Sequence, residues 1–150
     1  RDGIEHLPFL PGRNNIIKTG RNIILDDCYN ANPVSMRAAI DVLNLGIGRK
    51  VAILGNMGEL GKNEKELHYE VGTYLASTGT DAVIAVDELA KEIIRGLKDA
   101  GSAIETHWFP SRDELIPQLG SLIREGDNIL VKASNSMGFS GIVKALQELA

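Results

Sequence analysis

The sequence predicts an α/β fold in which a mostly parallel sheet is doubly wound, with an antiparallel hairpin before the first parallel strand. Three observations lead to this prediction. Short, unbroken apolar runs alternate with amphipathic helical stripes along most of the 150 residues, which is typical of βαβ units. The runs are continuous rather than alternating, as expected for parallel strands that are buried on both faces. Near the start of the chain, two strand-like segments are separated only by Gly20-Arg21, which indicates a tight hairpin.

The hairpin is predicted over Asn15–Thr19 and Asn22–Leu25, and its second arm leads into a polar loop. Asn32-Pro33 ends that loop and indicates a helix start, because Asn is a favoured N-cap and Pro is tolerated at the first helical position. Between the hairpin and this helix start, residues Asp26–Asn30 carry two carboxylates, the Tyr29 phenol and an amide. Open α/β sheets bind ligands at the carboxyl ends of their strands.

Each of these polar residues also has a purely structural interpretation. Asn32 can act only as a helix cap, one of Asp26 and Asp27 can bond loop amides, and Tyr29 can pack with its hydroxyl satisfied. From the residues alone, the binding role and the structural role of this loop are both open.

A glycine-containing loop, Gly55–Asn63, follows the apolar run Val51–Leu54. It departs from a phosphate-binding loop in two ways: five residues instead of four separate Gly55 from Gly61-Lys62, and Asn63 replaces the Ser or Thr that would contact magnesium. Loop geometry is therefore the preferred explanation of its glycines. Asn63 with Glu66 resembles a capping box that opens the next helix. His68 on this helix is interpreted as a surface or core-edge residue rather than a metal ligand, because no second His or Cys lies at metal spacing.

The same alternation continues to the end of the chain. Asp87 is predicted to cap the helix after the next strand, and Ser111 to open a capping box before the following helix. Pro117 lies too deep in that helix to be accommodated without a kink or a late start. The remaining strands are predicted at Ala82–Val86, Ile104–Phe109 (a possible edge) and Ile129–Val131, and a last helix carries Ile142, Val143, Leu146 and Leu149 on one face.

In this Rossmann-like arrangement, five polar segments gather at one edge of the sheet. They are the Asp26–Asn32 loop, the Gly55–Lys62 loop, Asp87, Ser111 and the Lys132–Ser136 loop. One function compatible with such a set is a phosphoacceptor receiver domain, which uses an acidic pair, an acceptor Asp, a hydroxyl and a lysine at successive strand ends. The extra hairpin, the long glycine loop and the missing proline after Lys132 argue against it.

Composition limits the remaining classes. A chain of 150 residues is long enough for one self-sufficient domain, predicted to span residues 1–150. Its net charge of −4 argues against non-specific nucleic-acid binding. No apolar stretch is long enough to insert in a membrane. The single cysteine, Cys28, suits a reducing, cytoplasmic compartment. Because the chain begins with Arg rather than Met, it is expected to be a fragment of a longer protein.

The segment Asp26–Ile40, which reads DDCYNANPVSMRAAI, resembles the signature of the C-terminal domain of the Mur ligases. Three further segments follow in that family's order: Pro11–Asn14, Leu54–Gly61 with His68 downstream, and Leu130–Met137. The first segment is specific to this family. Each of the other three is weak evidence alone, but together they are persuasive. The resemblance covers essentially the whole chain and is strongest to the branch of the family that uses D-alanyl-D-alanine.

The resemblance implies an ATP-dependent amide ligase of peptidoglycan precursor synthesis, with three domains. Such an enzyme activates the terminal carboxylate of UDP-N-acetylmuramoyl-tripeptide as an acyl phosphate, which the amine of D-alanyl-D-alanine attacks. The phosphate loop, the Mg²⁺ ligands and most catalytic groups are then expected in a central domain outside this chain, and the fragment alone is expected to be inactive. The C-terminal domain closes over the site, which would keep water from the acyl phosphate.

Family correspondence also implies roles for individual residues. Arg13 is expected at the nucleotide phosphates and Asp27 at the ribose, with Tyr29, Asn30 and Asn32 shaping the same wall. An arginine can grip phosphate through several donors, and a carboxylate can accept from both ribose hydroxyls. The residues expected to border the amine substrate are Lys132, Ser134 and Asn135. No catalytic residue and no metal ligand is expected in this domain.

The sequence departs from the family pattern at four positions. Cys28 replaces a usual Ser or Thr, and Asn56 replaces a usual Asp in the glycine loop. Ala133 and Asn135 replace the Gly and Arg of a Lys-Gly-Ser-Arg pattern. Asn135 therefore has two interpretations: it faces the dipeptide, or it caps the last helix, for which Asn is well suited.

Overall fold

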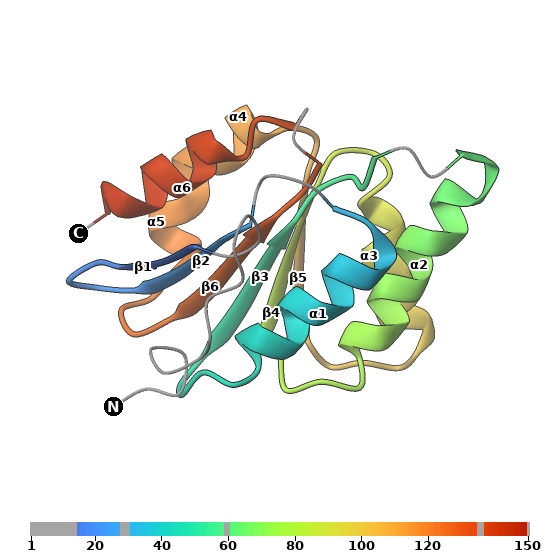
Figure 1. Cartoon of the computed structure of the whole chain (residues 1–150), viewed down its shortest axis with the longest axis horizontal. Helices are drawn as coiled ribbons and strands as arrows, with labels where there is room; N and C mark the ends of the chain where they lie inside the picture. The colour runs from blue at the N-terminus through green and yellow to red at the C-terminus, as the bar shows by residue number, and fades with distance from the viewer. Residues whose placement is uncertain (1–14, 28–30, 59–60, 135–136, 150) are drawn as a thin grey trace.

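The structure, a computed structural model, describes residues 15–27, 31–58, 61–134 and 137–149. Its centre is a six-stranded sheet in the order β1-β2-β6-β3-β4-β5 (Figure 1). The strands are β1 (Asn15–Lys18), β2 (Ile23–Asp27), β3 (Lys50–Leu54), β4 (Ala82–Val86), β5 (Glu105–Phe109) and β6 (Asn128–Lys132). β1 pairs antiparallel with β2, and the other neighbouring pairs are parallel. The predicted fold class is confirmed, including the hairpin and the edge position of β5.

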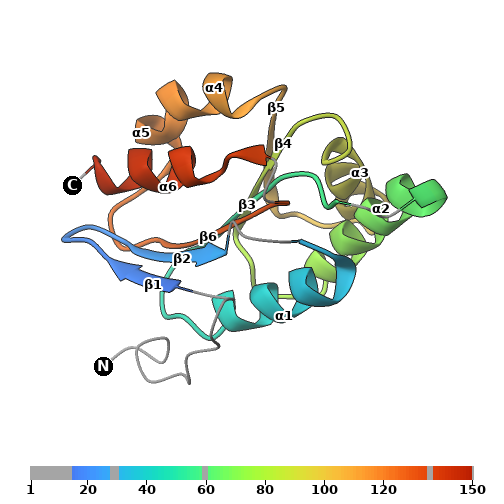
Figure 2. The ribbon, with the colours of Figure 1, turned by 45° about the horizontal axis from the view of Figure 1, so that its top comes forward.

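Helices cover both faces of the sheet (Figure 2). One layer contains α1 (Pro33–Leu43), α2 (Glu64–Leu75) and α3 (Lys91–Asp99). The other contains α4 (Arg112–Leu115), α5 (Leu119–Leu122) and α6 (Ser140–Gln147). Short 3-10 segments, η2 (Gly61–Asn63) and η3 (Ile116–Gln118), precede α2 and link α4 to α5. None of the helices within the described ranges is long and apolar enough to cross a membrane.

The alternating side chains of the central strands fill two separate cores. In β3, Ala52 and Leu54 belong to the core beneath α1, α2 and α3. Val51 and Ile53 belong to the core beneath the other three helices. Each of these four side chains is fully buried. A strand that is buried on both faces needs a continuous apolar run, which is why these strands were predictable from the sequence.

The position of β6 brings three strand ends together. β6 lies between β2 and β3, and its last residue, Lys132, is in register with Asp27 of β2 and with Leu54 of β3. The loops after β2 and β3 lead to the layer of α1 and α2, whereas the loop after β6 leads to α6 in the opposite layer. This divergence is the topological switch point at which open α/β sheets form their ligand sites.

One predicted helix feature is confirmed in part and one in full. Ser111 is the N-cap of α4 and accepts a hydrogen bond from the backbone N–H of Glu114, which is the N-cap half of the predicted capping box. Around Pro117 the helix gives way to the 3-10 segment η3, because proline lacks the N–H that an α-helical bond requires.

Two predicted side-chain caps are wrong. The Asn63 side chain makes no capping hydrogen bond at the start of α2, where η2 already occupies the preceding residues. Asp87 has a positive φ of 84° and accepts from the N–H of the next residue, while α3 begins only at Lys91. For Asn135, which lies outside the described residues, the capping alternative does not apply to α6, since that helix begins at Ser140 with Phe139 at the N-cap position. α3 thus starts later than the local signal indicated, whereas α2 does begin directly after Asn63, at Glu64, but without the predicted side-chain bond.

Candidate functional site

The loops after β2, β3 and β6 are joined to one another by backbone hydrogen bonds at the switch point. The N–H of Gly55 donates to the carbonyl oxygen of Lys132 at 3.0 Å, and the N–H of Ser134 donates to that of Asn56 at 2.9 Å. The N–H of Gly58 donates to the carbonyl of Ala31 at 3.4 Å. The three loops, which carry residues predicted to bind ligands, therefore form one hydrogen-bonded network.

Where these loops begin, Lys132 and Asp27 form an ion pair. The Lys132 Nζ lies 2.7 Å from Asp27 Oδ2, and the residues are 1% and 5% exposed. A buried charge is tolerated only when it is paired, so each residue accounts for the burial of the other. The resemblance assigned Asp27 to the nucleotide and Lys132 to the amine substrate, whereas the structure brings the two side chains together.

Asn32 serves as the N-cap of α1. Its Oδ1 accepts from the N–H of Ser35 at 2.8 Å, and the Ser35 Oγ accepts from the N–H of Asn32 at 3.0 Å. This reciprocal pair is a capping box, with Pro33 at the first helical position. The structural interpretation of Asn32 is thus confirmed, and the cap fixes the backbone just after the polar loop that follows β2.

Gly55 allows the loop after β3 to pass close to the start of α6. A Cβ at this position would lie 2.5 Å from Phe139 Cζ and 2.8 Å from the Ala133 Cβ. These distances are too short for any side chain at position 55 without movement of the core. Loop geometry therefore explains this glycine, as the sequence predicted, and no phosphate contact is needed to account for it.

Sequence reasoning missed the role of His68. Its side chain is fully buried on α2, so the expectation of a surface or core-edge position is wrong. Its Nε2 accepts from the N–H of Met57 at 2.9 Å, and its Nδ1 lies 2.6 Å from the carbonyl oxygen of Glu64. Burial is the main cause that lowers the pKa of His68 below its ordinary value. One signal was present: His68 precedes the apolar residue Val71 by three positions, which places both on one helix face.

Asn56 connects the glycine loop to the next strand end. Its Oδ1 accepts from the N–H of Ala90, just before α3, at 3.1 Å. The side chain thus supplies a hydrogen-bond acceptor at the start of a helix whose own N-cap residue has none. The usual Asp of the family pattern could make the same bond.

Of the remaining predicted site residues, the structure describes only Ser134. Ser134 is almost fully buried and lies beside the glycine loop, where its Cβ would be 3.3 Å from a Cβ at Gly58. Four of the predicted residues lie outside the described part of the chain: Arg13, Tyr29, Asn30 and Asn135. Among the residues that are described, no group of three or more His, Cys, Asp or Glu side chains could hold a metal ion.

The receiver interpretation does not fit the strand order. A receiver-type sheet has the order 2-1-3-4-5, with the lysine-bearing last strand at an edge. Here the lysine-bearing strand β6 lies between β2, which carries the acidic pair, and β3. Asp87 and Ser111 also use their side chains in local hydrogen bonds to the backbone.

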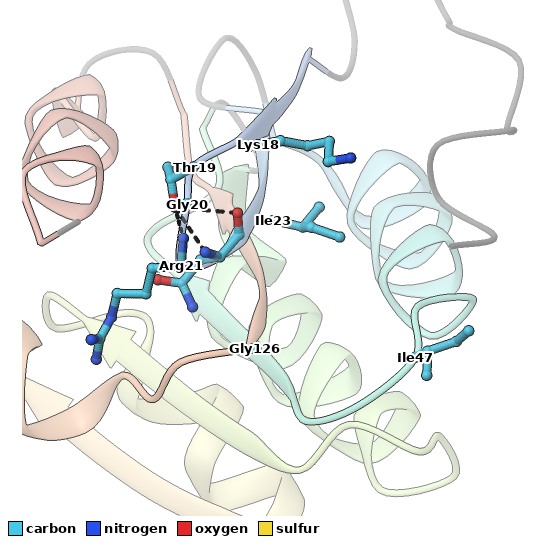
Figure 3. A pocket seen from close by; sticks show the side chains of 8 residues that line it. Lys18, Thr19, Gly20, Arg21, Ile23, Ile47 and Gly126 are labelled. Carbon is cyan, nitrogen blue, oxygen red and sulfur yellow. Dashed lines mark hydrogen bonds between the residues drawn. The ribbon is translucent and has the colours of Figure 1, made fainter. Parts of the chain in front are cut away.

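A hollow at the opposite end of the sheet contains none of the predicted site residues (Figure 3). It is lined by the hairpin turn between Lys18 and Ile23 together with Ile47 and Gly126. The polar groups of this turn bond to the segment before β6: Arg21 donates to the carbonyl of Ile123, and Asn22 to that of Arg124. This region fastens the hairpin to the sheet.

Comparison with known proteins gives a consistent result. Residues 12–135 match the family described as Mur ligase, glutamate ligase domain. The chain is 37% identical over 149 residues to the UDP-N-acetylmuramoyl-tripeptide–D-alanyl-D-alanine ligase of Escherichia coli, covering 97% of this chain and 32% of that protein. The Bacillus subtilis protein of the same name is 35% identical, with 97% and 33% covered. The chain thus spans about a third of the length of these curated relatives.

Solved structures show the same likeness in three dimensions. A crystal structure of MurF from Acinetobacter baumannii superposes with a TM-score of 0.83 at 32% identity, covering 96% of this chain and 32% of that one. MurF from Thermotoga maritima, crystallised in complex with ADP, gives a TM-score of 0.77 at 26% identity, with the same shares covered.

Proposed function

This chain belongs to the Mur ligase family as its C-terminal, glutamate ligase domain, and from this premise we propose that it serves a cytoplasmic D-alanyl-D-alanine-adding ligase. The parent enzyme would join D-alanyl-D-alanine to UDP-N-acetylmuramoyl-tripeptide, with ATP as the energy source, in peptidoglycan precursor synthesis. The observation that carries the proposal is the similarity of the chain to such ligases over nearly its whole length, together with the Asp27–Lys132 ion pair at the switch point.

The proposed reaction has two steps. The terminal carboxylate of the tripeptide attacks the γ-phosphorus of ATP, which gives an acyl phosphate and ADP. The amine of D-alanyl-D-alanine then attacks the acyl carbon, the amide forms, inorganic phosphate leaves and the amine loses a proton. The domain described here would close over this site and exclude water, which would otherwise hydrolyse the acyl phosphate.

Asp27 would contribute to the nucleotide side of the closed site. The carboxylate is held by Lys132 through Oδ2, so its orientation is set before the nucleotide arrives. A preorganised acceptor for a ribose hydroxyl loses little freedom when the site closes. The T. maritima relative was crystallised with ADP, which supports a nucleotide site in this family.

Arg13 would contact the phosphates, and Lys132, Ser134 and Asn135 would border the dipeptide. We place the Mg²⁺ ligands and the phosphate loop in a central domain of the parent enzyme.

Substitutions in the full-length enzyme test the nucleotide assignment. Arg13→Ala and Asp27→Ala should each lower kcat/KM for ATP by about 10- to 1,000-fold, because each removes a polar contact from a closed site. Lys144→Ala, at an exposed position on α6, is the control and should leave the kinetics unchanged. Wild-type kinetics in both Arg13→Ala and Asp27→Ala would refute the assignment.

The isolated domain provides a second test. It should neither ligate nor release ADP, and it should bind ATP weakly, since half of the proposed pocket is missing. Detectable ligation by the purified domain would contradict the proposal.

A further inference from the structure

We propose that His68 is a positioning residue, which in its neutral form holds the loop Gly55–Gly58 in place for the ligase reaction. The proposal rests on the proposed function for its kinetic part, although its structural part can be tested separately. His68 is fully buried on α2 and belongs to none of the binding groups assigned above.

The two hydrogen bonds of the ring fix its tautomer. The carbonyl oxygen of Glu64, 2.6 Å from Nδ1, can only accept, so Nδ1 must carry the proton. The N–H of Met57, 2.9 Å from Nε2, can only donate, so Nε2 must present its lone pair. Both ring nitrogens are therefore used, and the neutral Nδ1–H form satisfies both neighbours. A proton on Nε2 would face the Met57 N–H and break that bond.

The loop that His68 holds is connected to three strand ends. Gly55 donates to Lys132 at the end of β6, and Asn56 accepts from Ser134 just after that strand. Gly58 bonds to Ala31 after β2, and the Asn56 side chain bonds to Ala90 after β4. The Met57–His68 bond joins this set to α2. A shift of Met57 would thus be passed to Ser134 and Ala31, which adjoin the proposed substrate and nucleotide sides.

The surroundings of the ring favour its neutral form. Burial is the dominant effect and lowers the pKa of His68. The charged groups that oppose this effect are Glu64 on α2 and Glu92 on α3. Acidification should therefore protonate His68, release Met57 and loosen the loop.

Two substitutions separate positioning from simple filling of the core. His68→Gln can place its amide oxygen near the position of Nε2 and retain an acceptor for Met57, whereas His68→Phe fills the space without one. In the full-length enzyme, His68→Phe should speed amide hydrogen exchange of peptides containing Met57 and Ser134 by about tenfold or more. It should also lower kcat/KM by about 10- to 100-fold, as a small misplacement near a reacting centre does. His68→Gln should restore both values to near wild type.

A matched control and a pH series complete the design. His107→Phe changes a partly exposed histidine on the edge strand β5 and should leave exchange of the loop unchanged. In the wild type, loop exchange relative to β3 should rise between about pH 7.5 and about pH 5, and this rise should be absent in His68→Gln. The pH series applies even where His68→Phe does not fold.

The outcomes are distinct. Wild-type exchange in His68→Phe, or no pH response in the wild type, would overturn the proposal. Faster loop exchange with unchanged ligation kinetics would overturn its functional part. Should the wild-type enzyme not ligate at all, the proposed function would fail, while the exchange results would still decide whether His68 positions the loop.

Discussion

The ammonium of Lys132 lies 2.7 Å from the carboxylate of Asp27, in a pair that joins residues 105 positions apart. Parallel pairing of β2 with β6 places them opposite each other at the ends of their strands. Both side chains are almost completely buried, so neither charge can be left alone without a large cost.

The first prediction follows from this burial. Asp27→Asn and Lys132→Met should each lower the free energy of unfolding by about 3 to 5 kcal/mol, because each removes the opposite charge that lies beside a buried charge. The double variant should lose clearly less than the sum of the two. Urea unfolding of the four proteins gives the coupling energy directly. Additive losses would show that the two charges do not stabilise each other.

The origin of this pair also shows what the sequence could and could not predict. The apolar runs of β2, β3, β4 and β6 were recognisable because both faces of these strands are buried. The position of β6 between β2 and β3 depends on contacts between distant segments, and no local pattern encodes it. Asp27 and Lys132 were each predicted to be site residues, and their contact with each other depends on that strand order.

His68 and Asp87 illustrate two other reasons for failure. A histidine in a helical stripe is treated as polar, and its burial depends on an acceptor role toward Met57, outside its own helix. Asp87 follows a strand and precedes a helix, as a cap would, but its positive φ turns the chain before α3 begins. Local signals identified the loops correctly, whereas tertiary packing decided what each side chain does in them.

The second prediction concerns the contact between α2 and α3. A Cβ on Gly72 would lie 2.0 Å from the carbonyl oxygen of Ile93, and one on Gly96 would lie 2.2 Å from that of Tyr69. Gly72→Ala should therefore destabilise the domain by about 1 to 3 kcal/mol or more, despite the higher helix propensity of alanine. Thermal or urea unfolding measures the change.

Gly120 on α5 is the matched control for this substitution. A Cβ there meets only Leu149 Cδ2, at 3.9 Å, an ordinary contact distance. Gly120→Ala should be neutral or stabilise by up to about 1 kcal/mol, as expected from helix propensity alone. Equal effects at Gly72 and Gly120 would show that the two helices can separate at little cost.

The third prediction is the effect of pH on stability through His68. Its pKa is lowered from the ordinary histidine value of 6.5, mainly by burial. The unfolded chain therefore binds a proton at this residue more readily than the folded chain does, and stability falls as the pH drops below about 6.5. The loss continues until the pH reaches the lowered pKa of the folded state.

Comparison with His68→Gln isolates this contribution from the other titrating groups. Between about pH 7.5 and about pH 5, the wild type should lose more free energy of unfolding than His68→Gln does. The measurement is urea unfolding at the two pH values. An equal loss in both proteins would show that His68 does not titrate differently in the folded and unfolded chains.

The last prediction concerns Asn135, where the family pattern has an arginine. In the described structure α6 starts at Ser140 with Phe139 as its N-cap residue, so the capping role once open to Asn135 is not used by that helix. If this position faces the dipeptide carboxylate, a neutral amide forgoes roughly 1 kcal/mol or more relative to a guanidinium. Asn135→Arg in the full-length ligase should then lower KM for D-alanyl-D-alanine by about fivefold or more and leave KM for ATP nearly unchanged.

Gln147→Arg, which adds the same charge at an exposed position on α6, is the control and should change neither constant. A lower melting temperature of Asn135→Arg with an unaltered dipeptide KM would assign the residue a structural role instead.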